Sequence, residues 1–218
     1  MPKPAPLTSA PSDSALEPPF DPTSWSGAIR VMLALTAVLW VVQIVNALED
    51  YRLDRFGIRP RAIDGLWGVL ASPFLHASYG HLLANSAPFV LLGWVILLSG
   101  VRPFVIVTAV VVVVGGILTW LAAPAGLIVG VSALVMGWLG YLVARAIFSR
   151  RLLWIVIAVL VVFFFGTLLG GLLPSLDNGV SWQSHVFGFA AGVLAAWLLH
   201  PRPSRRPARI DHSEGDPA

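Results

Sequence analysis

The chain contains no cysteine and little charge, and both absences narrow what it can be. Without cysteine it can form no disulfide, no thiolate nucleophile and no cysteine-based metal site. Only 11% of its 218 residues are charged, whereas a soluble domain carries about 25%. Because 57% of the residues are hydrophobic, too little polar surface is available to cover a water-soluble globule.

The hydrophobic residues are concentrated in long runs. A run of about 20 apolar residues is long enough to span a hydrocarbon core about 30 Å thick. Six runs of this kind are predicted to be membrane-spanning helices: 28–48, 81–99, 104–122, 131–148, 152–173 and 182–199. We therefore predict an all-α integral membrane protein, with one six-helix domain over residues 27–200.

The two ends of the chain are rich in proline and poor in apolar residues. Residues 1–26 and 201–218 are therefore predicted to be disordered tails. The net charge of +3 indicates membrane topology and not nucleic-acid binding: with both tails in the cytoplasm, ten of the 14 lysines and arginines lie on that side. A compact chain without extra domains favours a bacterial inner membrane.

Four polar side chains fall inside the predicted spans, where burial in hydrocarbon is costly. His81 and Asn85 are four residues apart and share one face of the second span. Ser132 begins the fourth span, and His185 lies in the first turn or so of the sixth. On the predicted topology all four lie near the outer ends of their helices, so we expect them to form one site.

Three sequence segments carry these residues in a recognisable order. FLHASYGHLLAN (74–85) contains an H-x-x-x-N pattern, GVS (130–132) a G-x-S pattern, and SHVFG (184–188) is followed by Gly192. The motifs, their order and the six-span layout resemble the rhomboid family of intramembrane serine proteases. The resemblance covers residues 28–200 and implies a rhomboid-like six-helix bundle.

The resemblance implies a Ser-His dyad that hydrolyses peptide bonds of transmembrane protein substrates. Ser132 is then the nucleophile and His185 the general base, while His81 and Asn85, with the Ser132 N–H, stabilise the oxyanion. Gly130 belongs to the nucleophile motif, and Gly188 and Gly192 allow close helix packing. No cofactor, metal or nucleic acid is implied, and the remaining partners are membrane lipids.

The sequence departs from the family pattern at two positions beside the nucleophile. Ala133 stands where the G-x-S-G motif has its last glycine, and Met136 stands where the family often has an aromatic residue. Both changes bear on activity and not on the fold. His76, which precedes the second span, is expected to fix a loop through a hydrogen bond.

Two other functions compete with proteolysis. A catalytically inactive rhomboid-like protein that binds membrane clients is favoured by Ala133 and Met136 and opposed by retention of all four polar site residues. A transporter or channel is disfavoured because no charged residue lies deep in a span except Arg145. That side chain is expected to extend from its helix end toward water.

Overall fold

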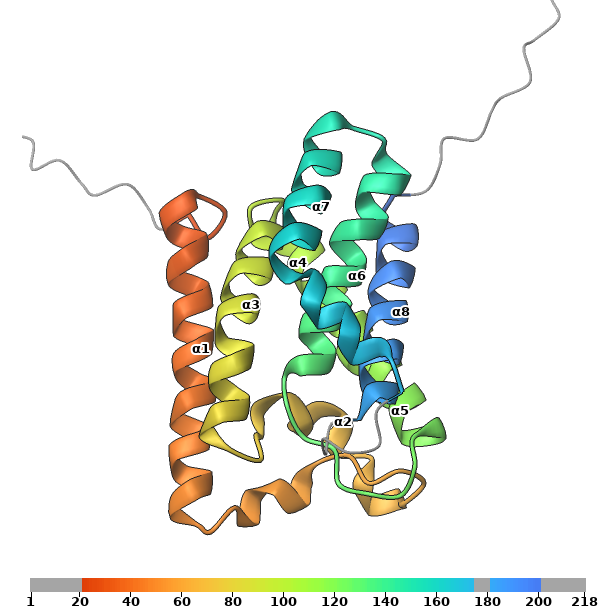
Figure 1. Ribbon diagram of the computed structural model, residues 1–218. Coiled ribbons are helices and arrows are strands. Elements are labelled where there is room, and N and C mark those ends of the chain that lie inside the picture. The colour runs from red at the N-terminus through yellow and green to blue at the C-terminus, as the bar shows by residue number, and fades with distance from the viewer. Residues whose placement is uncertain (1–20, 175–180, 201–218) are drawn as a thin grey trace, which may run out of the picture.

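The computed structural model describes residues 21–174 and 181–200, which form six helical spans long and apolar enough to cross a membrane (Figure 1). The spans are α1 (Trp25–Leu48), α3 (Tyr79–Leu97), Val101–Ala122, α6 (Ser132–Ser149), Leu152–Leu172 and α8 (Trp182–Leu199). The third comprises α4 (Val101–Val110), a π-helical turn η4 (Val111–Gly115) and α5 (Gly116–Ala122). The fifth comprises α7 (Leu152–Phe165) and the 3-10 helix η5 (Gly166–Leu172).

The predicted six-span all-α fold is confirmed, with small shifts at the helix ends. The third span begins three residues earlier than predicted because Pro103 sits inside the first helical turn, where its missing N–H is not needed. The first begins at Trp25, inside the predicted tail. The rest of that tail up to residue 20, and the whole predicted tail 201–218, lie outside the described residues.

Serine caps fix where three of the helices begin. The Ser24 hydroxyl accepts from the Gly27 N–H at the start of α1. Ser78 accepts from the His81 N–H at 3.1 Å, and Ser181 accepts from the Ser184 N–H at 3.3 Å. Satisfying these otherwise unpaired N–H groups sets each helix start. The last two caps therefore place a histidine in or beside the first turn of α3 and of α8.

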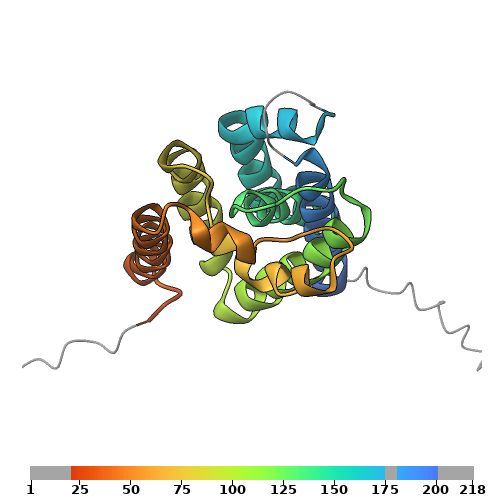
Figure 2. The same ribbon diagram turned by 90° about the horizontal axis from the view of Figure 1, so that it is seen from below.

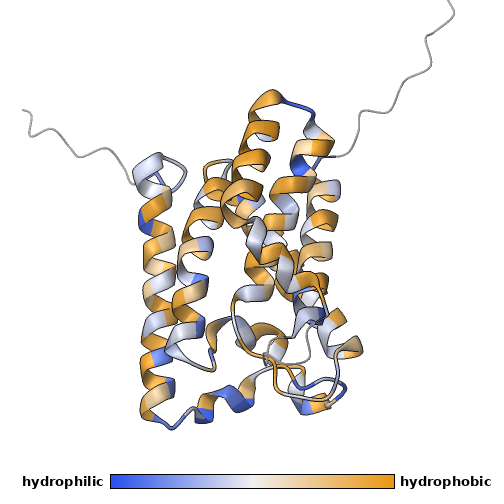
Figure 3. Cartoon of the chain, viewed as in Figure 1, coloured by the Kyte–Doolittle hydropathy of each residue, from blue (hydrophilic) through white to orange (hydrophobic). Residues whose placement is uncertain are grey.

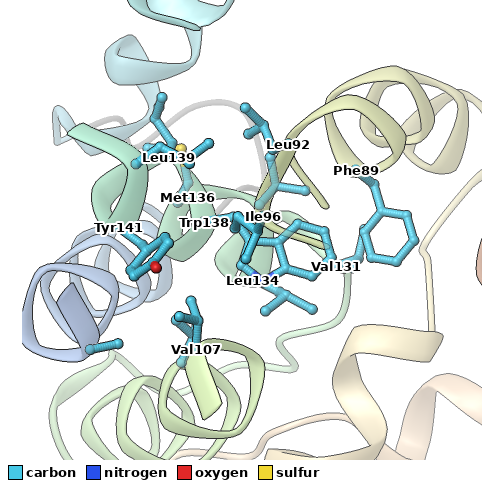
Figure 4. Close-up of a cluster of buried hydrophobic side chains, with 14 of the residues drawn as sticks. Phe89, Leu92, Ile96, Val107, Val131, Leu134, Met136, Trp138, Leu139 and Tyr141 are labelled. Atoms are coloured by element: carbon cyan, nitrogen blue, oxygen red, sulfur yellow. The ribbon is translucent and has the colours of Figure 1, made fainter. Parts of the chain in front are cut away.

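Helix α6 lies in the middle of the bundle, and α1 lies at its edge beside α3 (Figure 2). The core around α6 is built from large side chains (Figure 4). Trp138 is 1% exposed, stacks on Phe89 with ring centroids 5.0 Å apart, and donates from Nε1 to Thr108 Oγ1 at 3.2 Å. The indole N–H therefore has a hydrogen-bond partner although the ring is buried.

Helices α6 and α8 pack with their backbones close together. A Cβ on Gly188 would collide with the Ala133 carbonyl, and one on Gly192 with the Gly137 carbonyl. This is the small-residue packing predicted for the sixth span. The π-helical turn η4 packs on the same region, because a Cβ on Gly115 would lie 3.3 Å from the Gly188 Cα. The sequence analysis did not predict that turn.

The outer surface of the spans is apolar (Figure 3), as expected of a multi-pass membrane protein. Helix α7 is the least covered span, and Phe163 on it is 79% exposed. The segment between α1 and α3 folds over one end of the bundle as four short helices: η1 (Arg52–Phe56), η2 (Ile63–Gly65), α2 (Gly68–Ala71) and η3 (Ser72–Phe74). A single antiparallel bridge between Ile58 and Ile128 joins it to the segment before α6.

Candidate active site

Ser132 and His185 lie at the starts of α6 and α8, at the end of the bundle opposite to the start of α1 and the end of α8 (Figure 1). Ser132 is the first residue of α6, and His185 lies in the first turn or so of α8. The close packing of these two helices brings Ser132 Oγ within 2.9 Å of His185 Nε2. Two residues 53 positions apart thus form a direct side-chain hydrogen bond.

The second ring nitrogen of His185 is held by the backbone of η5. His185 Nδ1 lies 3.1 Å from the Gly171 carbonyl oxygen. A carbonyl can only accept a hydrogen bond, so Nδ1 carries the proton and Nε2 presents its lone pair to the Ser132 hydroxyl. A Cβ at position 171 would lie 2.7 Å from Nδ1, which makes glycine the fitting residue there.

Sequence reasoning missed Gly171. The signal available was the pair Gly170-Gly171 shortly before Pro174, which marks a break at the end of the fifth span. Such a break says where the helix is interrupted. It does not say which side chain the freed carbonyl will meet, because that depends on how α7 and η5 lean against α8.

The loop before Ser132 is held in an unusual conformation. Gly130 has φ of +121°, which side chains with a Cβ rarely adopt, and its N–H donates to the Ser72 carbonyl at 2.9 Å. The next N–H, of Val131, donates to His76 Nε2 at 3.2 Å. The predicted loop-fixing role of His76 is therefore confirmed. Both bonds tie the nucleophile segment to the loop that leads into α3.

His76 is suited to that bond because it is fully buried. Burial lowers the pKa of His76 to about 4, and the nearby His81 acts in the same direction. The two rings lie 5.2 Å apart edge to face. His76 is consequently neutral near pH 7, and its Nε2 can accept the Val131 N–H.

The two side chains predicted to stabilise an oxyanion, those of His81 and Asn85, occupy different positions relative to the cavity. The His81 ring lines the same cavity as Ser132 and His185 and faces Gly130, where a Cβ would lie 3.1 Å from His81 Nε2. Asn85 lies one turn further along α3, is 8% exposed, and donates from Nδ2 to the His81 carbonyl at 2.8 Å. Asn85 does not line the cavity. Its role in the site stays a prediction.

The shared cavity has a volume of about 450 Å³. Its remaining walls come from the segments before α3, α6 and α8 and from the first turn of α8: Ala77, Ser78, Leu127, Ile128, Val129, Ser181 and Ser184. The N-terminal turn of α6 points its unpaired backbone N–H groups toward this end of the bundle, where the helix dipole favours negative charge. The arrangement places the Ser132 hydroxyl, the His185 ring and the His81 ring around one space.

The two departures beside Ser132 leave this geometry in place. The Ala133 carbonyl lies against Gly188, and Met136 is 2% exposed within the hydrophobic core. The hydrogen bond between Ser132 and His185 forms with both residues present. Among the described residues, no group of three or more His, Asp or Glu side chains could hold a metal ion.

Six apolar spans and a Ser-His pair at the ends of two tightly packed helices define a polytopic membrane protein with a preformed polar site. A family model described as the Rhomboid domain matches residues 64–202, more than half of the chain. The chain therefore belongs to the rhomboid family.

Several bacterial proteins are similar to this chain over most of their length. An uncharacterized protein of Mycobacterium tuberculosis (strain H37Rv) is 39% identical over 203 residues, covering 88% of this chain and 85% of that protein. A Mycobacterium leprae protein is 39% identical over 200 residues, covering 88% and 79%. YdcA of Bacillus subtilis, provisionally named a rhomboid protease, is 27% identical over 185 residues, covering 82% and 91%.

Proposed function

We propose that this protein is an intramembrane serine endopeptidase whose nucleophile is Ser132 and whose general base is His185. The observation that carries the proposal is the 2.9 Å contact between Ser132 Oγ and His185 Nε2, with Nδ1 anchored on the Gly171 carbonyl. A nucleophile, a base within hydrogen-bond reach and a third group that orients the base are the parts that acyl transfer requires.

In the proposed reaction Ser132 Oγ attacks the scissile carbonyl carbon, and its proton passes to His185 Nε2. The oxyanion is stabilised by the Ser132 N–H and by the side chains of His81 and Asn85; one such donor is worth about 2.7 to 4 kcal/mol. The C–N bond then breaks as His185 protonates the leaving amine. Water, deprotonated by His185, releases the acyl group from Ser132 as a carboxylate.

The position of the cavity indicates which class of substrate can reach Ser132. It lies at one end of an apolar bundle, so the segment that reaches it is the end of another transmembrane helix. Carbonyls inside a helix are hydrogen-bonded and shielded, and the scissile bond must therefore be locally unwound before Ser132 can attack. Rhomboid proteases act on membrane-protein substrates, and we propose the same class for this chain.

Cleavage of a model single-span substrate in liposomes tests the proposal. We expect the parent protein to cut, and Ser132→Ala and His185→Ala each to abolish cleavage. Ser184→Ala is the matched control, because Ser184 lines the same cavity but donates its hydroxyl to the Ser181 carbonyl at 2.7 Å. Cleavage that persists in Ser132→Ala would refute the assignment.

The inactive client-binding alternative is tested with a fluorophosphonate probe, which labels activated serines without needing a substrate. Labelling of Ser132 in a parent that cuts nothing would mean that the wrong substrate was offered. A folded parent that neither cuts nor labels would favour the client-binding function. In that case Ala133→Gly and Met136→Tyr, which restore the family pattern, are the variants to test for recovered labelling.

A further inference from the structure

The end of the bundle remote from Ser132 holds a second polar cluster that the proposed reaction does not use. Arg145 lies on α6 about 20 Å along the helix from Ser132. Its Nη1 donates to Ser99 Oγ at 2.7 Å and to the Tyr141 hydroxyl at 3.2 Å. Its guanidinium carbon lies 3.4 Å from the ring centroid of Trp154. The side chain is partly buried and joins α6 to α7 and to the segment that follows α3.

Among the residues that the structure describes, the cluster has no negative partner. Within residues 21–174 and 181–200 the one ion pair joins Arg59 and Asp64, in the segment that covers the other end of the bundle. All the groups that Arg145 contacts are neutral, and Arg145 Nε and Ser149 Oγ are buried without any hydrogen-bond partner. A guanidinium carries five N–H donors, and leaving one buried and unpaired is costly. The site therefore has an unpaired N–H donor and a positive charge, both on Arg145, that are available to an anion.

Further positive charge surrounds the cluster. Arg150 and Arg151 are exposed in the turn between α6 and α7. His200, just after α8, lies 3.3 Å from the Tyr141 hydroxyl through Nε2. Burial, together with the positive charges of Arg145 and Arg151, holds the pKa of His200 below its usual value, so these groups face a common region. Arg150 and Arg151 would add to the attraction of Arg145 for an anion, whereas His200 is neutral near pH 7.

An apolar groove lies between α3, which ends before Ser99, and α7, which carries Trp154. It has a volume of about 530 Å³ and is lined by Leu91, Leu92, Trp94, Val95, Leu160, Val161, Phe164 and Phe165. Leu92 and Val95 share one face of α3 with Ser99, and Val161 lies two turns from Trp154 on the same face of α7. The groove residues therefore lie within a few turns of Ser99 and Trp154, two of the three side chains that contact Arg145.

We propose that this end of the bundle binds an anionic membrane phospholipid, with its phosphate against Arg145 and an acyl chain in the groove between α3 and α7. Arginine matches phosphate geometry with paired N–H donors, and basic pockets between transmembrane helices are suited to lipid headgroups. A lipid is favoured over free phosphate because the groove beside the cation is apolar. The proposal is independent of proteolysis.

Native mass spectrometry of the full chain, released from nanodiscs of equal phosphatidylglycerol and phosphatidylcholine, tests the charge requirement. We expect the parent to retain phosphatidylglycerol preferentially, and Arg145→Gln to retain it about tenfold less. Arg30→Gln is the matched control, because Arg30 is exposed on α1 outside the cluster. Equal retention by the parent and Arg145→Gln would overturn the proposal.

Two further variants keep the test decisive if Arg145→Gln disturbs the fold, as judged by thermal unfolding in lipid-free detergent. Leu160→Trp narrows the groove without touching the cation, and we expect it to lower lipid retention. Arg145→Lys keeps the charge but not the paired donors, and we expect intermediate retention. Parent-like retention in both, or displacement of the lipid by inorganic phosphate with no effect of Leu160→Trp, would overturn a lipid site.

Discussion

Replacing Gly171 with alanine is expected to slow proteolysis while leaving the fold intact. The new Cβ would lie 2.7 Å from His185 Nδ1, whereas ordinary contact begins at 3.4 Å, so the ring must move by about 0.7 Å. Movement on that scale turns Nε2 away from Ser132 and lengthens the bond from Nδ1 to the carbonyl. A misplacement near 1 Å costs about 10²-fold in rate, or about 2.7 kcal/mol of activation free energy.

The assay is kcat/KM for a single-span substrate in liposomes, together with the rate of fluorophosphonate labelling, which reports Ser132 reactivity alone. Gly170→Ala is the matched control, because a Cβ at this neighbouring glycine would have no atom within 4 Å. We expect that variant to match the parent in both measurements. Parent-like rates in Gly171→Ala would refute the claim that the Gly171 carbonyl orients His185.

Acid should lower the free energy of unfolding, because the pKa of His76 in the folded protein is lowered from 6.5 to about 4. The contribution of neutral His76 to stability is complete above about pH 6.5 and is lost as the pH falls through about 4. His76→Phe should remove about 3 kcal/mol of this pH dependence in thermal unfolding. Gly192→Ala should cost about 1 to 3 kcal/mol, and Gly126→Ala, with open space around it, almost nothing. His81→Ala should lower kcat/KM by about 10²- to 10³-fold and Asn85→Ala by less; equal losses would contradict the different places of the two side chains.

A backbone carbonyl occupies the place that a carboxylate holds in a Ser-His-Asp triad. The Gly171 carbonyl fixes the tautomer of His185 but carries no full negative charge to stabilise the imidazolium. A carboxylate there would itself be costly to bury at the end of a membrane span. The arrangement keeps the orienting function while avoiding a buried anion.

Local chemistry made much of the molecule predictable. Hydropathy and length identify the six spans, because a helix in hydrocarbon must satisfy its own backbone and cover about 30 Å. Ser78 and Ser181 mark two helix starts through caps that need only neighbouring residues. The order of the motifs then indicated that Ser132 and His185 belong together, although spacing alone could not show that α6 and α8 touch.

Tertiary structure decided the rest, because it depends on how each helix is rotated and how deep it lies. Hydropathy cannot say that Asn85 turns its amide to the His81 carbonyl, or that the break after α7 offers the Gly171 carbonyl to His185. Nor can it say that Arg145 meets Ser99, which follows α3. The sequence by itself determined which segments can cross the membrane and which residues are candidates for the chemistry. Helix packing determined which of those residues face one another, since that choice is made by contacts between spans far apart in the chain.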